Sequence, residues 1–383
     1  MNDFTRTRRG ALLVAHCAGM LDLVSLPVWM GALIGWYRFD PQQAGLLASL
    51  FLAGQVASSV LLAPKFMHVP LRAAAATGFA VAALSFFGVS LSTSYPVMAL
   101  LHFTGGLGAG CALSVTHGLI GRSANPHRLF AAAGFALALF GILMLGGGSR
   151  LVATHGGAAL FALFAAVMLV ALVAAAIGFP RVDDTTHRHG ASQARLPRQV
   201  WFGMVGMGLL ALAQAAMFSF VERIGADRGY GSTAVTGVLV AAGIVNLLPA
   251  PLAGWLQHRL RAETVVVAGP LLHAAIAFAV THTSSFPVYA ALVSTLIAVA
   301  VFTHTFLFGL LARHDASGRA VAATPAMLMI GAAIGPLLGG SAVKLMGYPA
   351  LGIIVACTGV LSALVFTGAR ERRLASALAQ QVD

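Results

Sequence analysis

Long apolar segments, separated by short polar ones, constrain this chain more than any other feature of its sequence. A helix that crosses a bilayer needs roughly 20 apolar residues, and each segment has about that length. Charged residues make up only 9% of the 383 residues, whereas about a quarter is usual in soluble domains. The sequence therefore predicts an all-α membrane protein with twelve transmembrane helices, at approximately 10–36, 42–63, 71–91, 95–121, 128–149, 156–179, 199–222, 232–257, 263–281, 286–312, 320–342 and 348–369.

One long hydrophilic connection divides the chain near its middle. We expect an N-terminal six-helix half at 1–180, a cytoplasmic linker at 181–198 and a C-terminal six-helix half at 199–383. Two landmarks recur at nearly half the chain length, which indicates that the halves arose by duplication. The first landmark is Gly118-Leu119-Ile120 with Arg122 and Arg128, repeated as Gly309-Leu310-Leu311 with Arg313 and Arg319; the second is Gly147-Gly148-Ser149, repeated as Gly339-Gly340-Ser341.

The positions of lysine and arginine predict the orientation in the membrane. If the N-terminus is cytoplasmic, 18 of the 23 basic residues fall in inside segments and 5 fall outside. Such a bias is typical of cytoplasmic loops, so we expect a multi-pass protein of the cell inner membrane with both termini in the cytoplasm. The net charge of +12 is spread over many loops, which argues against a nucleic-acid-binding face. The arginines before the first segment resemble a signal peptide, but the segment is too long, so we expect it to remain uncleaved.

Asp22 is the only acidic residue well inside an apolar segment. A carboxyl at this depth must be protonated or paired, and it is a functional-site hypothesis by default. Most helical neighbours at three- and four-residue spacing are small, among them Ser25, and they leave room for water or a ligand. Two interpretations remain open: proton coupling or substrate contact, and a protonated carboxyl that serves packing alone.

Two motifs resemble those of the major facilitator superfamily. The eleventh segment, Gly331-Ala-Ala-Ile-Gly335-Pro336-Leu-Leu-Gly339-Gly340, looks like the tail of the family pattern G-x3-G-P-x2-G-G. The fourth, His102-Phe-Thr-Gly-Gly106-Leu-Gly108, is similar to the pattern R-x-x-x-G-x-G. The resemblance implies two pseudosymmetric halves around a central cavity. It also implies interdomain packing by the five glycine and proline positions quoted from the eleventh segment. His258 stands where a family loop motif has an acid, so the chain resembles a divergent branch of the family.

His102 stands where the family commonly has a buried arginine implicated in proton transfer. Counting about 1.5 Å per residue in a core of about 30 Å puts His102 at a depth comparable with Asp22. We therefore expect a proton to be exchanged between Asp22 and His102. The alternative is that His102 is a hydrogen-bonded packing residue.

Further cavity residues are expected from the C-terminal half. The polar and large side chains of segments seven and ten that fit this role are Gln214, Met217, Phe218 and His304. Phe218 also fits a plain core contact. Glu222, near the outer end of segment seven, is expected to form an ion pair with its neighbour Arg223.

A soft-metal site is a weaker hypothesis. His16 and Met20 lie four residues apart with Cys17 nearby, a set that suits Cu(I). Methionine is an ordinary packing residue in lipid, so no metal and no cofactor is expected.

The best-supported function at this stage is proton-coupled export of small hydrophobic or cationic solutes by alternating access. One acid and no basic residue in the inferred cavity disfavour an anionic solute. No phosphate-binding loop is present, so the energy source is not ATP. Import of a small metabolite, metal chelate or copper is the alternative; a channel or an intramembrane enzyme is more remote, since no catalytic constellation is found. The expected partners are the lipid bilayer, the solute and protons, and the expected state is a monomer.

Overall fold

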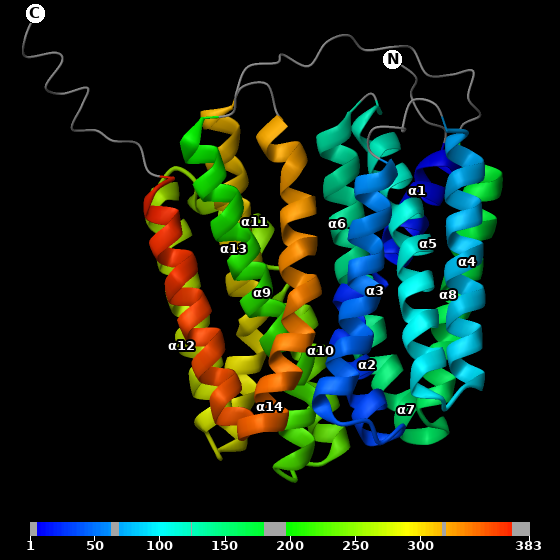
Figure 1. Ribbon diagram of the computed structural model, residues 1–383. Coiled ribbons are helices and arrows are strands. Elements are labelled where there is room, and N and C mark those ends of the chain that lie inside the picture. The colour runs from blue at the N-terminus through cyan, green and yellow to red at the C-terminus, as the bar shows by residue number, and fades with distance from the viewer. Residues whose placement is uncertain (1–5, 63–68, 124, 180–196, 316–318, 370–383) are drawn as a thin grey trace, which may run out of the picture.

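The computed structural model describes residues 6–62, 69–123, 125–179, 197–315 and 319–369, and every element in these ranges is a helix (Figure 1). The expected linker 181–198 lies outside the described residues except for its last two positions. The helices are α1 Arg6–Gly19, α2 Leu21–Gly35, α3 Pro41–Leu62, α4 Leu71–Leu91, α5 Tyr95–Gly121, α6 Pro126–Leu143, η2 Met144–Gly148, α7 Ser149–His155, α8 Gly157–Gly178, α9 Arg198–Asp227, α10 Ser232–Val245, α11 Pro249–Leu256, α12 Ala262–His282, α13 Phe286–His314 and α14 Arg319–Thr367.

These helices form the expected spans, several of them interrupted. The pairs α1 with α2 and α10 with α11 each make one span, and α6, η2 and α7 together make another. By length and composition, 11 helices in the described part of the chain can cross a membrane, and the last of them covers 42 residues. Gly347, with φ of 80°, divides this last one into two spans. The prediction of an all-α bundle of twelve spans is therefore confirmed.

Local sequence explains two of the interruptions. Pro249 has no N–H to donate, and the chain breaks between α10 and α11 just before it. The glycine run at 146–148 coincides with η2, where the helix widens to a π-helical turn. Breaks of this kind in a bilayer occur where protein or water covers the freed backbone groups.

The duplication is visible in the helix limits. α4 begins at residue 71 and ends at 91, and α12 begins at 262 and ends at 282, so both limits differ by 191. The same offset relates left-handed backbone positions at the turns: Arg38 with Gly229, and Gly156 with Gly347. The fold therefore consists of two pseudosymmetric halves, here called the N-half (6–179) and the C-half (197–369), which lie side by side in Figure 1.

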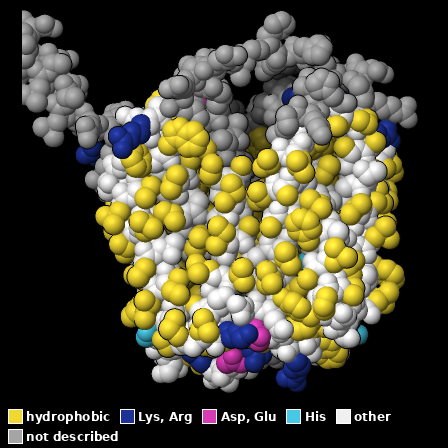
Figure 2. Space-filling model, viewed as in Figure 1, with side chains coloured by type: hydrophobic (Ala, Val, Ile, Leu, Met, Phe, Trp, Pro, Cys, Tyr) yellow, Lys and Arg dark blue, Asp and Glu magenta, His cyan; other side chains and the backbone are white. Residues whose placement is uncertain are grey.

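The two ends of the bundle differ in charge. We call the end where α1 begins and α8 ends the arginine-rich side; Arg6, Arg72, Arg122, Arg128, Arg198, Arg259 and Arg313 lie at helix ends there. The opposite end, at the bottom of Figure 1, is the far side. Figure 2 shows hydrophobic side chains over the visible wall and charged side chains gathered at the far edge. A wall of this composition suits contact with lipid.

The halves meet where α3 packs against α14. A Cβ on Gly45 would overlap the carbonyl oxygen of Pro336, and a Cβ on Gly340 would overlap that of Pro41. Close by, the Leu337 N–H donates to Ser49 Oγ at 3.1 Å, from the C-half to the N-half. Glycine thus allows two backbones to touch, which is how helices gain packing energy in lipid.

The remaining contacts between the halves also lie between the far edge and the middle of the bundle. A Cβ on Gly146 would press on Val240 of α10, and one on Gly243 would press on Ile142 of α6. At the far edge, Lys344 Nζ lies 2.9 Å from Asp40 Oδ2 and donates to Gln42 Oε1 at 3.2 Å. The hydrogen bonds, the ion pair and the glycine contacts named here therefore join the halves between the far edge and the middle of the bundle.

Of the five positions in segment eleven that were expected to pack between the halves, the structure places two at the boundary and three inside the C-half. Pro336 and Gly340 face α3 of the other half. Gly331, Gly335 and Gly339 pack on α9 inside the C-half. Residues four apart share one helix face, and the step from 335 to 336 turns by about 100°, so the motif serves two neighbouring helices.

Replacing Gly340 with Ala tests the backbone contact between α3 and α14. The added methyl group has no room against Pro41, and overpacking of this kind costs about 1–3 kcal/mol. We expect a lower melting temperature in detergent and slower transport. Gly134→Ala is the matched control, because a Cβ there meets nothing within 4 Å. Equal melting temperatures for Gly340→Ala and Gly134→Ala would contradict the contact.

Asp40→Asn tests the ion pair at the far edge. Partial burial opposes ionisation of Asp40, but hydrogen bonds from the Gln43 and Gln42 N–H groups and the Lys344 ammonium outweigh it and lower its pKa. Asparagine retains the reciprocal cap, in which Gln43 N–H donates to Oδ1 at 2.9 Å, and loses only the charge.

Because the folded pKa of Asp40 is lowered, its charge stabilises the fold above its unfolded pKa of about 3.9 and stops doing so as pH falls through the folded value. Thermal unfolding should show the wild type slightly more stable than Asp40→Asn at pH 7, by less than about 1 kcal/mol for a partly exposed pair. At about pH 3 the difference should shrink. A difference that grows in acid would contradict this assignment.

Candidate functional site

Asp22 lies in the first turn of α2, directly after the break at Met20 between α1 and α2. Its residue surface is 2% exposed. Oδ1 accepts a hydrogen bond from Gln55 Nε2 at 3.2 Å, and the same nitrogen donates to the Gly19 carbonyl at 3.1 Å. Oδ2 is enclosed and has no hydrogen-bond partner, and no described basic side chain forms an ion pair with Asp22. The carboxyl therefore has one side-chain donor and no counter-charge.

The surroundings hold Gln55 firmly in place. A Cβ on Gly110 of α5 would overlap the Gln55 backbone, so α5 and α3 touch at this level. Ser59 Oγ donates to the Gln55 carbonyl at 2.8 Å, and Ser114 Oγ donates to Ser59 Oγ at 2.8 Å. A polar track thus runs from Asp22 through Gln55 towards the arginine-rich side, inside the N-half.

Asp22 faces the interior of the N-half rather than the boundary between the halves. Trp29, seven residues later, lies on the same face of α2, whereas Gly31 lies on the opposite face and contacts the C-half. Ser25 is fully buried, and its Oγ donates to the Leu21 carbonyl at 2.6 Å. The room that the sequence suggested beside Asp22 is therefore filled by protein in this conformation.

His102 does not meet Asp22. Its Nδ1 lies 2.7 Å from the Met98 carbonyl oxygen, its Nε2 is enclosed without a partner, and its ring stacks on Trp29 with centroids 5.3 Å apart. Trp29 is seven residues from Asp22, about 10 Å along α2. The expectation of equal depth was wrong because it assumed a core of about 30 Å, whereas the 27 residues of α5 extend about 40 Å.

The expected cavity residues of the C-half lie inside that half. Gln214 Oε1 is 2.7 Å from His273 Nε2 of α12, and His304 lies close enough to His273 to interact with it electrostatically. Met217 and Phe218 are buried core residues, 0% and 5% exposed. None of these four residues lines the pocket described below.

His16 pairs with His117 rather than with Met20. The Nδ1 of His16 lies 3.0 Å from Nε2 of His117, and this hydrogen bond occupies one nitrogen of each ring. In the described part of the chain no group of three or more His, Cys, Asp or Glu residues is placed to bind a metal ion. Sequence reasoning missed His117, because its partner is 101 residues away.

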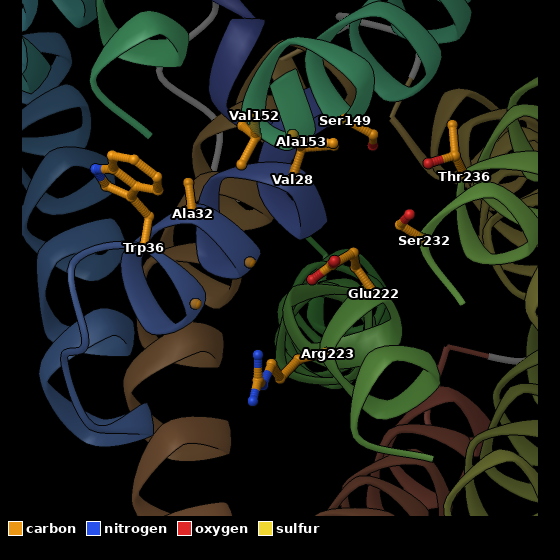
Figure 3. Close-up of a pocket in the computed structure, with 12 residues that line it drawn as sticks. Val28, Ala32, Trp36, Ser149, Val152, Ala153, Glu222, Arg223, Ser232 and Thr236 are labelled. Atoms are coloured by element: carbon orange, nitrogen blue, oxygen red, sulfur yellow. The ribbon is translucent and has the colours of Figure 1, made fainter. Parts of the chain in front are cut away.

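A pocket of about 220 Å³ lies between the halves on the far side (Figure 3). It is lined by α2, α7, α9 and α10, with Val28, Gly31, Ala32, Gly35, Trp36, Ser149, Val152, Ala153, Glu222, Arg223, Ser232 and Thr236. Figure 3 shows the Glu222 carboxyl directed from α9 towards α2.

Glu222 differs from its sequence-based interpretation. The expected ion pair with Arg223 is wrong: Arg223 pairs with Asp227 one turn later, and no described residue forms an ion pair with Glu222. Adjacent residues on a helix point in different directions, which explains the difference. Glu222 Oε2 lies where a Cβ on Gly31 would stand, and it is enclosed with no hydrogen-bond partner. The only indication in the sequence that Glu222 could be functional is its place in the last two turns of the apolar part of α9.

A family model described as Major Facilitator Superfamily matches residues 11–316. No curated protein matches the chain. Among solved structures, a mutant of the nucleoside transporter NupG has a TM-score of 0.75 at 13% identity and covers 95% of this chain and 100% of its own. The D-xylose-proton symporter has a TM-score of 0.69 at 17% identity and covers 94% of this chain and 95% of its own.

These identities are low, so the structural likeness shows the fold alone. The family model, in contrast, covers well over half of the chain. Together with the two six-helix halves, this match settles the family. The chain belongs to the major facilitator superfamily of membrane transporters.

Proposed function

We propose that this protein is a proton-coupled secondary transporter that exports small hydrophobic or cationic solutes, and that Asp22 carries the coupled proton. The observation that carries the proposal is the enclosed, unpartnered Oδ2 of Asp22. An ionised carboxylate without a counter-charge costs several kcal/mol in such a place, so the closed conformation favours the protonated form.

The break at Met20 supplies a way to release the proton. α1 ends at Gly19 and α2 begins at Leu21, so α2 can rotate without carrying all of α1. Such a movement would change the exposure of Asp22, which is two residues from the break. Asp22 suits this role better than His102, because the His102 ring is fixed by Met98 and by its stack on Trp29.

The contacts between the halves support a direction of loading. The contacts named above lie on the far side, so they hold the two halves together at that end. We assign the arginine-rich side to the cytoplasm of a cell inner membrane, with both termini there, by the positive-inside rule. An exporter loads its solute from that side. One chain contains both halves of the proposed pathway, so we expect it to act as a monomer, without a cofactor.

The lining of the far-side pocket supports the proposed solute class. Val28, Ala32, Val152 and Trp36 supply apolar surface, and Glu222 supplies a carboxyl. The one basic side chain of the lining, Arg223, is paired with Asp227. An apolar wall with an acid favours apolar or cationic solutes over anions.

Uptake of a neutral polar solute is the second candidate. It is favoured by the names of the two solved transporters, one for nucleosides and one for D-xylose with protons. A proton-coupled importer would use the same Asp22 step with the opposite direction of solute flow.

Asp22→Asn tests the proton-coupling role. Asparagine mimics the protonated acid, so we expect loss of solute accumulation driven by a proton gradient, with solute exchange across the membrane retained. The assay uses proteoliposomes, an imposed pH gradient and counterflow, with a lipophilic cation, a nucleoside and D-xylose as probes. Asp40→Asn is the control. Undiminished uphill transport in Asp22→Asn would remove Asp22 from the mechanism; uphill uptake of the nucleoside or D-xylose instead of the cation would favour the importer.

Gln55→Ala tests the donor to Asp22. A hydrogen bond to a charged group contributes about 1.5–3 kcal/mol, so its loss should disfavour the ionised carboxylate and slow proton release roughly tenfold or more. We expect lower proton-driven transport with little change in exchange. Gln214→Ala is the matched control, since that amide bonds to His273 inside the other half. Similar losses in the two variants would point to a packing defect instead.

A further inference from the structure

Glu222 occupies a special position in the duplicated fold. It lies 191 residues after Gly31, the same offset that relates α4 to α12. Glu222 and Gly31 are therefore counterparts in the two halves, and they touch each other. A contact between counterparts lies on the pseudo-twofold axis, at the boundary where the two halves face each other.

No described basic side chain forms an ion pair with this carboxyl; Arg223, which lines the same pocket, acts on it only at longer range. On its own helix, Arg223 pairs with Asp227, and Arg228 donates to the carbonyls of Val280 and Thr281 at 2.8 and 2.7 Å. From the C-half, Tyr289 of α13 donates to the Val221 carbonyl, and Tyr348 of α14 donates to Asp227.

The helices that face Glu222 across the pocket contribute no titratable side chain to the pocket lining. α2 contributes Gly31 and Gly35, α7 contributes Ser149, and α10 contributes Ser232 and Thr236. Arg150 of α7 is exposed and does not line the pocket.

We propose that Glu222 is a second protonation site, which must hold a proton for the two halves to close on the far side. It loses that proton when they part. The inference rests on the proposed transport function and adds a proton step at the boundary between the halves. Asp22 lies inside the N-half on the other face of α2, so the two carboxyls are separate sites.

The physical reason is the change in solvation on closure. When the halves meet, Oε2 is pressed against Gly31 and has no hydrogen-bond partner. A charge on Oε2 there lacks a hydrogen-bond donor and an ion-pair partner, so an ionised Glu222 opposes closure and a protonated one permits it. When the halves part, water reaches the carboxyl and the proton can leave on the far side. A closure step linked to one proton changes the ratio of open to closed molecules by up to about tenfold per pH unit.

The experiment measures far-side separation directly. Spin labels are placed at Thr154 on α7 and Thr233 on α10, both exposed at the far end, after replacement of Cys17, Cys111 and Cys357 by serine. Distances between the labels are measured by double electron–electron resonance in lipid nanodiscs over a range of pH. In the labelled parent protein we expect a short-distance population in acid and a growing long-distance population as pH rises.

Glu222→Gln gives the decisive comparison, because glutamine resembles the protonated acid in shape. We expect it to remain in the short-distance population at every pH, while Glu263→Gln, the same change at an acid of α12 that pairs with Arg313 on the arginine-rich side, keeps the parent's response. A pH response that persists in Glu222→Gln would overturn the proposal, as would a parent protein whose distances change with a lipophilic cation but not with pH. A melting temperature in detergent equal to that of the parent shows that the variant is folded.

Failure of the proposed Glu222 step can be distinguished from failure of the proposed transport function. If Asp22→Asn abolishes proton-driven transport but Glu222→Gln leaves the pH response of the distances intact, Asp22 is the coupling site and the second site fails. If Glu222→Gln fixes the distances while Asp22→Asn transports uphill normally, the Glu222 step stands and the role of Asp22 fails.

Discussion

The backbone contact between α3 and α14 is the interaction on which the rest of this structure depends. Gly45 and Gly340 let each helix touch a carbonyl of the other, and Ser49 accepts the Leu337 N–H across the boundary. Lipid provides no hydrophobic drive for helix association, so the closeness of the two halves comes from such packing and hydrogen bonding. Because these contacts lie on the far side, they bring Glu222 against Gly31 and close that end of the bundle.

The two sides of the pseudo-twofold axis are not equally filled. Gly340 and Pro41 touch, whereas their counterparts at the 191-residue offset, Ser149 and Ser232, line the pocket. The same fold thus has a dry contact on one side of the axis and a cavity beside a carboxyl on the other. The boundary between the halves is tightly packed at α3 and α14. At α7 and α10 it borders the pocket, where a change in the charge of Glu222 would act most directly.

Much of the fold could be predicted from the sequence, because apolar run length fixes where helices cross a bilayer. The expected segments at 71–91 and 95–121 coincide with α4 and α5. The site was harder to predict. Asp22 stood out as a buried acid, but its partner Gln55 is 33 residues away and carries no charge or periodic signal. Adjacency in sequence suggests an ion pair between Glu222 and Arg223, but the side chains of adjacent residues on a helix point in different directions. Depth along a tilted or overlong helix also cannot be counted from loop positions alone, as His102 shows.

The central claim is that this conformation encloses two carboxyls, Asp22 inside the N-half and Glu222 at the boundary between the halves, and that both are protonated rather than paired. Infrared spectroscopy of the protein in lipid measures this most directly, because a protonated carboxyl and a carboxylate absorb at different frequencies. The account predicts absorption from enclosed, protonated carboxyls at neutral pH, with one component missing in Asp22→Asn and another missing in Glu222→Gln. A neutral-pH spectrum without protonated carboxyls, or one that both substitutions leave unchanged, would contradict it.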